Sequence, residues 1–321
     1  MKAIVYTKYG SPDELQLQEV TKPTPKDNEL LIKVRATAVN RSDWEFLTGW
    51  ALGRLSSLGP FRPGHKILGS DIAGEVEAVG SAVTQFQPGD AVFGDILMVM
   101  GGFAEYVCAP PHILARKPAE LSFEVAASLP QAAVIALQGI RDKGKVQPGQ
   151  HVLINGAGGG AGTFAVQFAK MAGAEVTAVD NAAKFDLLRS LGADQLIDYT
   201  QEDFIQSGGQ YDMILDVIGH RSALACKRAL TPTGRYYMAG GSTGAILNVG
   251  LIGTLIGLFN DQKITILPVQ PNIKDLQHIA ELVAAGKITP IIEKCYPLSQ
   301  TPEALRQLGE NRAQGKLIIT M

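Results

Sequence analysis

Between about residues 123 and 286 the hydrophobic pattern alternates between the spacing of buried strands and that of amphipathic helices. Strand-like apolar runs cover 152–154, 175–179, 195–199 and 213–219, and helical spacing covers 184–192 and 222–230. A strand that is covered on both faces has a nearly continuous apolar sequence. The alternation therefore predicts an α/β domain, a doubly wound parallel sheet over residues 123–286.

The flanking segments have a different pattern. Residues 1–122 contain short β-type runs separated by Pro and Gly, which predicts a mostly β domain, a partly open barrel. Residues 287–321 carry similar runs, so we expect this end of the chain to return to the first domain. Residues 40–50 are predicted as a loop that holds both tryptophans. This loop either borders a ligand cleft or covers the β core.

The segment 236–260 contains no charged residue, and Gly253 and Gly257 form a GxxxG pattern. A membrane-spanning helix is therefore an alternative to consider. The first residues fit a sheet strand better, and several glycines interrupt the rest. We expect a loop and a short helix that cover a cleft or join two subunits.

Composition narrows the classes of function. The formal net charge of −2 gives no basic surface for nucleic acid or for an anionic membrane. Cys108, Cys226 and Cys295 are few and widely separated, which excludes a disulfide framework and favours a reducing cytoplasm. The first residues read as a strand without the apolar core of a signal peptide.

A glycine cluster after the strand at 152–154 carries the strongest chemical signal. Small residues let the backbone approach a pyrophosphate, and the following helix offers N–H groups and the positive end of its dipole. A second strand ends at Asp180, about 20 residues further on, where a ribose-binding acid is expected. These features predict a dinucleotide site. The residues expected to bind the cofactor here are Ala157, Gly158, Gly159, Gly160, Ala161 and Gly162.

Several motifs occur in the order of one known family. They are Gly149–Gln167, Gly89–Gly94, Gly102–Tyr106, Leu129–Ala133, Ser190–Asp194 and Gly315–Ile319. Together they resemble the zinc-free quinone oxidoreductases, the zeta-crystallin branch of the medium-chain dehydrogenases/reductases, over essentially the whole chain. The resemblance implies a GroES-like catalytic domain, here 1–122 with 287–321, split around a Rossmann domain at 123–286. It also implies NAD(P)H bound between them and a homodimer or homotetramer.

The same resemblance bears on metal binding. Metal-dependent relatives have a cysteine where this chain has Asn40, and His-Glu where it has Ser70-Asp71. An amide and a hydroxyl are poor zinc ligands, and the five histidines show no ligand spacing. We therefore expect neither zinc nor a flavin.

Without a Lewis acid, hydride transfer to a conjugated acceptor is easier than oxidation of a simple alcohol. The predicted function is an NAD(P)H-dependent, zinc-independent reductase of a quinone or an α,β-unsaturated carbonyl compound. The resemblance places Asn40 and Ser42 beside the nicotinamide as orienting residues. Trp44 and Trp50 are candidate walls of the substrate cleft.

The choice of nucleotide depends on the residues that follow the second strand. The carboxylate of Asp180 would accept hydrogen bonds from a 2′-hydroxyl and repel a 2′-phosphate, whereas Lys184 would attract the phosphate. We slightly favour NADH over NADPH; the alternative is that Asp180 faces solvent. The remaining predicted cofactor contacts are Tyr199, Ile218, Gly240, Gly241 and Lys316.

Two other functions remain open at this point. One is a zinc-free alcohol or aldehyde oxidoreductase. The other is an NAD(P)H-binding protein of low turnover, acting as a sensor or a structural protein. Initial rates with a quinone, an enone and an alcohol distinguish the reductase from the alcohol or aldehyde oxidoreductase. Tight binding of NAD(P)H without its oxidation would indicate the sensor or structural protein.

Overall fold

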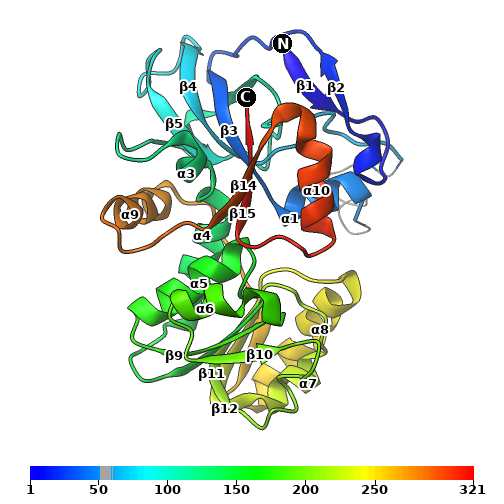
Figure 1. The fold of residues 1–321 in the computed structure, drawn as a ribbon, viewed down its shortest axis with the longest axis vertical. Helices are drawn as coiled ribbons and strands as arrows, with labels where there is room; N and C mark the ends of the chain where they lie inside the picture. Colours follow the sequence, from blue (N-terminus) through cyan, green and yellow to red (C-terminus); the bar gives the residue numbers. More distant parts are fainter. Residues whose placement is uncertain (51–58, 60) are drawn as a thin grey trace. The chain divides into compact units, whose positions relative to one another are not determined.

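The computed structural model describes residues 1–50, 59 and 61–321. The chain forms two compact units, Met1–Val134 with Pro271–Met321 (unit 1) and Ile135–Gln270 (unit 2). Unit 1 is built mainly on antiparallel strands and unit 2 on a parallel sheet, so the predicted α/β fold class is confirmed (Figure 1). The sequence predicted 123–286 for the second domain, and the compact unit is shorter at both ends.

The described strands of unit 1 form a two-stranded sheet and a larger, seven-stranded one. The strands are β1 Lys2–Val5, β2 Gln16–Glu19, β3 Leu30–Val39, β4 Asp71–Val79, β5 Ala91–Asp95, β6 Tyr106–Ala109, β7 Leu114–Arg116, β14 Ile292–Pro297 and β15 Lys316–Thr320. The described larger sheet has the order β14-β15-β3-β4-β5-β7, and β6 also pairs with β3. Because Leu317 pairs with Val39 in antiparallel register, the side chains of Lys316 and Asn40 are neighbours in space.

Unit 1 also carries helices around these sheets. They are α1 Arg41–Thr48, α3 Phe123–Ala127, α4 Pro130–Leu137, which continues into unit 2, α9 Ile273–Ala284 and α10 Thr301–Gly309, with short 3₁₀ turns η1 Pro12–Glu14, η2 Pro111–Ile113 and η5 Leu298–Gln300. α3 and α4 are separate helices, with Pro130 as the first residue of α4, and the side chain of Asn272 caps the start of α9.

The prediction of a loop at 40–50 is wrong, because α1 occupies Arg41–Thr48. The carboxylate of Asp43 accepts a hydrogen bond from the backbone N–H of Asn40, the reach-back half of a capping box. Gly49 ends the helix in the left-handed conformation with φ of 70°. The capping residue Asp43 and the terminating Gly49 are both visible in the sequence. The helix between them was missed because it is short and its apolar spacing is weak.

Unit 2 contains a sheet in which every described pairing is parallel. Its strands are β8 His151–Asn155, β9 Glu175–Asp180, β10 Gln195–Asp198, β11 Tyr211–Asp216, β12 Leu230–Met238 and β13 Lys263–Ile266, in the order β10-β9-β8-β11-β12-β13. The order reverses between β8 and β11, and ligands bind such sheets at this point, beyond the carboxyl ends of the strands.

Helices cover both faces of this sheet (Figure 1). They are the π-helical segment η3 Gln138–Gly144, α5 Gly160–Met171, the 3₁₀ turn η4 Ala182–Lys184, α6 Phe185–Ser190, α7 Ala223–Arg228 and α8 Thr243–Phe259. α5 and α6 lie on one face, and α7 and α8 lie on the other. The ends of β8, β9, β11 and β12 that carry the predicted cofactor residues are therefore joined to helices by short turns.

The prediction of a loop and a short helix at 236–260 is wrong, because α8 is a helix of 17 residues. Its glycines do not interrupt it. A Cβ at Gly253 would lie 2.3 Å from the carbonyl oxygen of Ile264, so the missing side chain lets α8 pack closely on β13. Among the residues that the structure describes, no helix has both the length and the apolarity to span a membrane.

Candidate functional site

The glycine turn of unit 2 has the geometry of an anion-binding site. Gly156 follows β8 with φ of 81°, which favours glycine. α5 begins at Gly160, and its N-cap, Gly159, has no side chain to bond the first turn. A Cβ at Gly162 would lie 2.2 Å from the carbonyl oxygen of Gly156. The first N–H groups of α5 have no partner within the helix, so this cradle fits a dinucleotide diphosphate.

Asp180 lies at the end of β9 and is tied to this turn. Its Oδ2 accepts a hydrogen bond of 2.8 Å from the backbone N–H of Gly158. The ammonium of Lys184 lies 3.2 Å from its Oδ1, and both side chains are buried. The alternative that Asp180 faces solvent is therefore wrong. A Cβ at Gly158 would lie 2.4 Å from Cδ of Lys184, so the lysine stem packs directly on the glycine turn.

Tyr199 lies near this group, just beyond β10. Its backbone N–H donates a hydrogen bond of 3.4 Å to the carbonyl oxygen of Asp180, and its side chain is half exposed. The structure thus brings Gly158, Asp180, Lys184 and Tyr199 together at the carboxyl ends of β9 and β10. Their contacts with a ribose or an adenine stay predictions.

Asp216, at the end of β11, forms hydrogen bonds with residues at the ends of neighbouring strands and in the turn after β11. The sequence analysis did not select this residue. Its Oδ1 accepts hydrogen bonds from the backbone N–H groups of Ile218 and Gly219, at 3.0 and 2.8 Å, and from the side chain of Asn155 at 2.8 Å. Its Oδ2 accepts a hydrogen bond of 2.8 Å from the hydroxyl of Tyr236. An acid at the end of an apolar strand was the available signal.

Gly219 and Gly240 pack closely at this edge of the sheet. A Cβ at Gly219, where φ is 56°, would lie 2.0 Å from the carbonyl oxygen of Gly240. The predicted contacts Ile218, Gly240 and Gly241 therefore belong to two adjoining turns held by Asp216. Their contacts with a cofactor stay predictions.

Unit 1 holds a second group of predicted site residues, centred on Asn40. The carboxylate of Asp43 accepts hydrogen bonds from the backbone N–H groups of Asn40 and Gly69, at 2.8 and 3.0 Å. The side chain of Asn40 makes other contacts. Its Nδ2 donates to the hydroxyl of Ser70 at 3.1 Å, and its Oδ1 accepts from the ammonium of Lys316 at 2.5 Å.

Ser42 joins the same network through Gln131, a residue that the sequence analysis did not select. The hydroxyl of Ser42 donates to Oε1 of Gln131 at 3.0 Å, and Nε2 of Gln131 donates to the hydroxyl of Ser70 at 3.2 Å. The two serine oxygens are 3.5 Å apart. We call Asn40, Ser70, Ser42 and Gln131 the polar row. Its members come from distant segments, so only the fold brings them together.

Buried ionisable groups surround the polar row. Lys316 is only 3% exposed, and its ammonium lies 3.8 Å from Oδ2 of Asp71, which is fully buried. Burial raises the pKa of Asp71 to about 8, and also raises that of Asp95. Burial raises the pKa of Asp43 to about 7, against the effect of its two backbone hydrogen bonds. Burial lowers the pKa of Lys316, and the nearby carboxyls oppose that effect.

The two tryptophans make different contacts. The ring of Trp44 lies over Gly309, where a Cβ would come within 2.1 Å of it, and packs on the core beneath α10. Trp50 is half-buried, and its indole nitrogen has no hydrogen-bond partner among the described residues. The packing of Trp44 favours the alternative that it covers the β core. The role of both residues as cleft walls stays a prediction.

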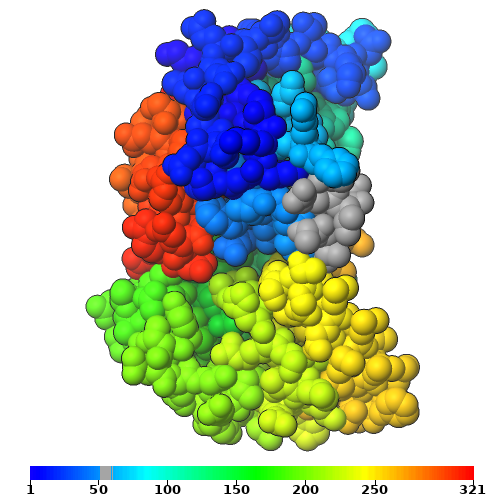
Figure 2. All heavy atoms as spheres, turned by 90° about the vertical axis from the view of Figure 1, so that its right-hand side faces the viewer, coloured from blue at the N-terminus to red at the C-terminus, as the bar shows by residue number. Residues whose placement is uncertain are grey.

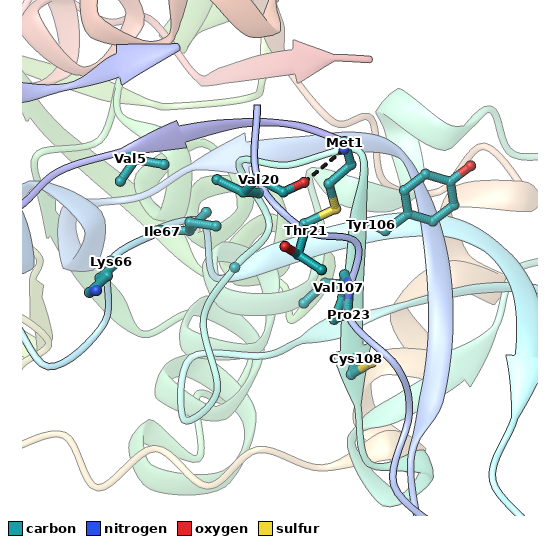
Figure 3. Close-up of a pocket in the computed structure, with 11 residues that line it drawn as sticks. Met1, Val5, Val20, Thr21, Pro23, Lys66, Ile67, Tyr106, Val107 and Cys108 are labelled. Carbon is teal, nitrogen blue, oxygen red and sulfur yellow. Dashed lines mark hydrogen bonds between the residues drawn. The ribbon is translucent and has the colours of Figure 1, made fainter. Parts of the chain in front are cut away.

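A pocket of about 370 Å³ lies elsewhere in unit 1 (Figure 3). Its lining is mainly apolar and consists of Met1, Val5, Val20, Thr21, Pro23, Lys66, Ile67, Gly101, Tyr106, Val107 and Cys108. Neither the polar row nor any predicted site residue contributes to it. We therefore place the candidate chemistry at the polar row rather than in this pocket.

Metal-ligand geometry is a separate question. Within residues 1–50, 59 and 61–321, no group of three or more His, Cys, Asp or Glu side chains is arranged to hold a metal ion. At the positions considered in the sequence, Asn40 and Ser70 present an amide and a hydroxyl, and the ammonium of Lys316 lies beside them. This donor set fits Zn²⁺ poorly, since zinc prefers thiolate and imidazole ligands.

Comparison with known proteins identifies the family. Residues 26–119 match the alcohol dehydrogenase GroES-like domain, and residues 191–319 match a family described as zinc-binding dehydrogenase. A chloroplastic quinone-oxidoreductase homologue from Spinacia oleracea is 31% identical, covering 99% of this chain and 98% of the relative. The chain belongs to the quinone oxidoreductase family of the medium-chain dehydrogenases/reductases.

Two further relatives of this quinone oxidoreductase family member agree with the assignment. The 2-methylene-furan-3-one reductase of Solanum lycopersicum is 33% identical, covering 99% of this chain and 79% of the relative. The solved structure of the quinone oxidoreductase from Coxiella burnetii is 31% identical, has a TM-score of 0.90 and covers 100% of this chain and 99% of that one. The predictions of the family and of an oxidoreductase are confirmed.

Proposed function

We propose that this protein is an NAD(P)H-dependent reductase of quinones or α,β-unsaturated carbonyl compounds. The observation that carries the proposal is the glycine cradle at the start of α5, joined to the buried carboxylate of Asp180. This arrangement suits the diphosphate and ribose of a dinucleotide. Relatives named as a quinone oxidoreductase homologue and as a furanone reductase support the class of acceptor.

Each part of the chain has a separate task in this proposal. The cradle and Asp216 hold the turns that bind the cofactor. When bound there, a reduced nicotinamide would supply the hydride. Asn40 and Ser42 orient the acceptor, and the hydroxyl and amide N–H groups of the polar row stabilise charge that develops on its oxygen. A quinone or enone spreads this charge over its own conjugated system, so a hydrogen-bond donor stabilises it without a metal, and water supplies the proton that completes the reduction.

The proposed reaction is independent of zinc. Asn40 and Ser70 are poor ligands, and the ammonium of Lys316 beside them would repel a cation. Elemental analysis of the purified protein, followed by assays after treatment with a chelator, tests this. We expect full activity without stoichiometric zinc, and loss of activity that zinc restores would contradict the proposal.

NADH remains the slightly favoured cofactor. The carboxylate of Asp180 lies beside the glycine cradle, where it would repel a 2′-phosphate. The ion pair with Lys184 offsets part of its charge, which supports use of NADPH as well.

We also propose a homodimer formed through unit 2. β13 is an edge strand of the described sheet, and α8 packs beside it. α8 exposes Leu247, Leu251, Leu255 and Leu258, spaced so that they form one stripe. The yellow surface in Figure 2 includes α8. An apolar stripe beside an unpaired strand edge is suited to a second copy of the same surface.

The cytoplasm is the proposed location. Cys108, Cys226 and Cys295 are all unpaired, and Cys226 is buried. Free thiols fit a reducing compartment.

Initial rates test the reductase proposal. Purified protein is mixed with NADH or NADPH and with a quinone, an enone or an aldehyde, and oxidation of the cofactor is followed by the loss of its near-ultraviolet absorbance. We expect kcat/KM for the quinone or enone to exceed that for the aldehyde at least about tenfold. Tight cofactor binding without oxidation by any acceptor would instead indicate a sensor or structural protein.

A further inference from the structure

Lys316 is a buried lysine inside the candidate site of unit 1. Its ammonium contacts Oδ1 of Asn40 and faces the carboxyl of Asp71. Burying an ammonium is costly, so a simple structural strand would favour an apolar residue here. The next three residues on β15, Leu317 to Ile319, are apolar and buried, as such a strand requires. The lysine therefore needs an explanation beyond packing.

We propose that Lys316 is a positioning residue that fixes the side-chain amide of Asn40 in one orientation and thereby sets the direction of the hydrogen bonds in the polar row. This inference rests on the proposed reductase function. It assigns to Lys316 a task inside unit 1 that is distinct from the direct cofactor contact predicted from the sequence.

The first step follows from the donors and acceptors of the two groups. An ammonium has three donors and no acceptor, whereas an amide has a carbonyl acceptor on one side and an N–H₂ donor on the other. Lys316 therefore requires the carbonyl side of Asn40, and the N–H₂ side is left to face Ser70. If the amide of Asn40 were reversed, its N–H₂ group would face the ammonium of Lys316, and two donors would oppose each other.

The second step concerns Ser70. Its oxygen accepts hydrogen bonds from Nδ2 of Asn40 and from Nε2 of Gln131, so both of its lone pairs are occupied. Its own hydrogen is thus available in the direction of Ser42, at an oxygen–oxygen distance of 3.5 Å, which is long for a hydroxyl. If Asn40 were reversed, Ser70 would donate to Asn40 instead, and this donor would be lost.

The third step is the placement of the ammonium. The pairing of Leu317 with Val39 brings Lys316 to Asn40, the residue after β3. Oδ2 of Asp71 lies 3.8 Å from the ammonium, while its Oδ1 has no hydrogen-bond partner among the described residues. The strand register thus places the ammonium at the carbonyl side of Asn40, with the carboxyl of Asp71 beside it. Ser42, at the other end of the polar row, is partly exposed and can contact the substrate that accepts the hydride.

The lysine-to-methionine variant K316M tests the inference, because methionine keeps an unbranched side chain and removes the charge. The control is K294M, which makes the same change at an exposed position on the neighbouring strand β14. The first readout is independent of turnover: hydrogen exchange of the Asn40 side-chain amide, followed by ¹⁵N NMR. The second is the separation of kcat from the KM of the cofactor.

We expect K316M to exchange the Asn40 amide hydrogens faster than the wild type, and kcat with a quinone to fall on the order of tenfold with little change in the KM of the cofactor. K294M should behave as the wild type. Unchanged exchange and unchanged kcat in a folded K316M would overturn the inference. If the wild-type protein turns over no acceptor, the reductase proposal fails, while the exchange measurement still decides the role of Lys316.

A pH titration of the wild type covers the case in which K316M does not fold. The carboxyls that face Lys316 are Asp43 on α1, Asp71 on β4 and Asp95 on β5. Above its lowered pKa the amine becomes neutral and can accept a hydrogen bond, so it no longer selects one orientation of Asn40. Amide exchange becomes faster with pH in any protein. Above the pKa of Lys316 we expect the Asn40 amide to exchange faster than this general increase accounts for. Exchange that follows only the general increase would contradict the inference.

Discussion

The ammonium of Lys184 lies 3.2 Å from Oδ1 of Asp180, and both side chains are buried beside the glycine turn. The acid that would select NADH is thus paired with the base that would attract the phosphate of NADPH. Oδ2 of the same acid holds the N–H of Gly158. One carboxylate therefore shapes the turn and affects the choice of nucleotide.

Replacing Asp180 by serine should shift the preference toward NADPH. The variant removes a negative charge and leaves Lys184 free to pair with a 2′-phosphate. We expect the ratio of kcat/KM for NADPH to that for NADH to rise about tenfold. Asp186→Ser is the control, because Asp186 is a fully exposed acid on α6. An unchanged ratio in Asp180→Ser would show that Asp180 does not determine the choice between NADH and NADPH.

Replacing Gly162 by alanine should weaken both stability and cofactor binding. The added Cβ would lie 2.2 Å from the carbonyl oxygen of Gly156, so the turn must shift. Overpacking of this kind costs about 1–3 kcal/mol of unfolding free energy. Chemical denaturation and fluorescence titration with NADH and NADPH measure the two effects. Gly244→Ala on α8 is the control, since nothing lies within 4 Å of its added Cβ. Equal behaviour of the two variants would contradict the close packing at Gly162.

The buried carboxyls of unit 1 should make stability fall as pH rises. Burial raises the pKa of Asp43 to about 7 and that of Asp71 to about 8, from 3.8. The folded chain keeps protons that the unfolded chain releases, so their stabilising contribution is complete below about pH 4 and is lost as pH rises to about 8. The slope from one such group is at most about 1.4 kcal/mol per pH unit.

Urea denaturation at several pH values across this window measures the effect. Asp71→Asn cannot titrate, so the dependence of its unfolding free energy on pH should be weaker than in the wild type. Asp186→Asn, at an exposed position, should keep the wild-type slope. A slope that Asp71→Asn leaves unchanged would show that Asp71 does not retain its proton in the folded chain.

Charges on the apolar stripe of α8 should dissociate the proposed dimer. Leu251 and Leu255 are 69% and 52% exposed, so replacing both by lysine should leave the fold intact and place like charges in the interface. Sedimentation velocity should show a dimer for the wild type and a monomer for the double variant. Leu17→Lys in unit 1, also exposed, should remain a dimer. A monomeric wild-type protein would refute the dimer.

Periodicity and local motifs were sufficient for much of unit 2. Its buried strands are continuous apolar runs, and the glycine cluster identifies the turn. At Gly156, Gly158 and Gly162 a Cβ would lie within 2.7 Å of a neighbouring atom, so these three positions need glycine. The same reasoning failed for α8, where glycine indicates close packing on β13 rather than a break in the helix. The sequence alone does not show whether a glycine ends a helix or allows close packing, because that depends on its neighbours in space.

By itself, the sequence determined the alternation of strands and helices, the glycine turn, the acid after it and the family. These are local properties, because they depend on residues close together in the chain. The tertiary structure decided which distant residues meet. It joins Lys316 to Asn40 across 276 positions and Gln131 to Ser42 across 89. Such contacts depend on strand register and packing, and the spacing of the residues in the sequence does not specify them.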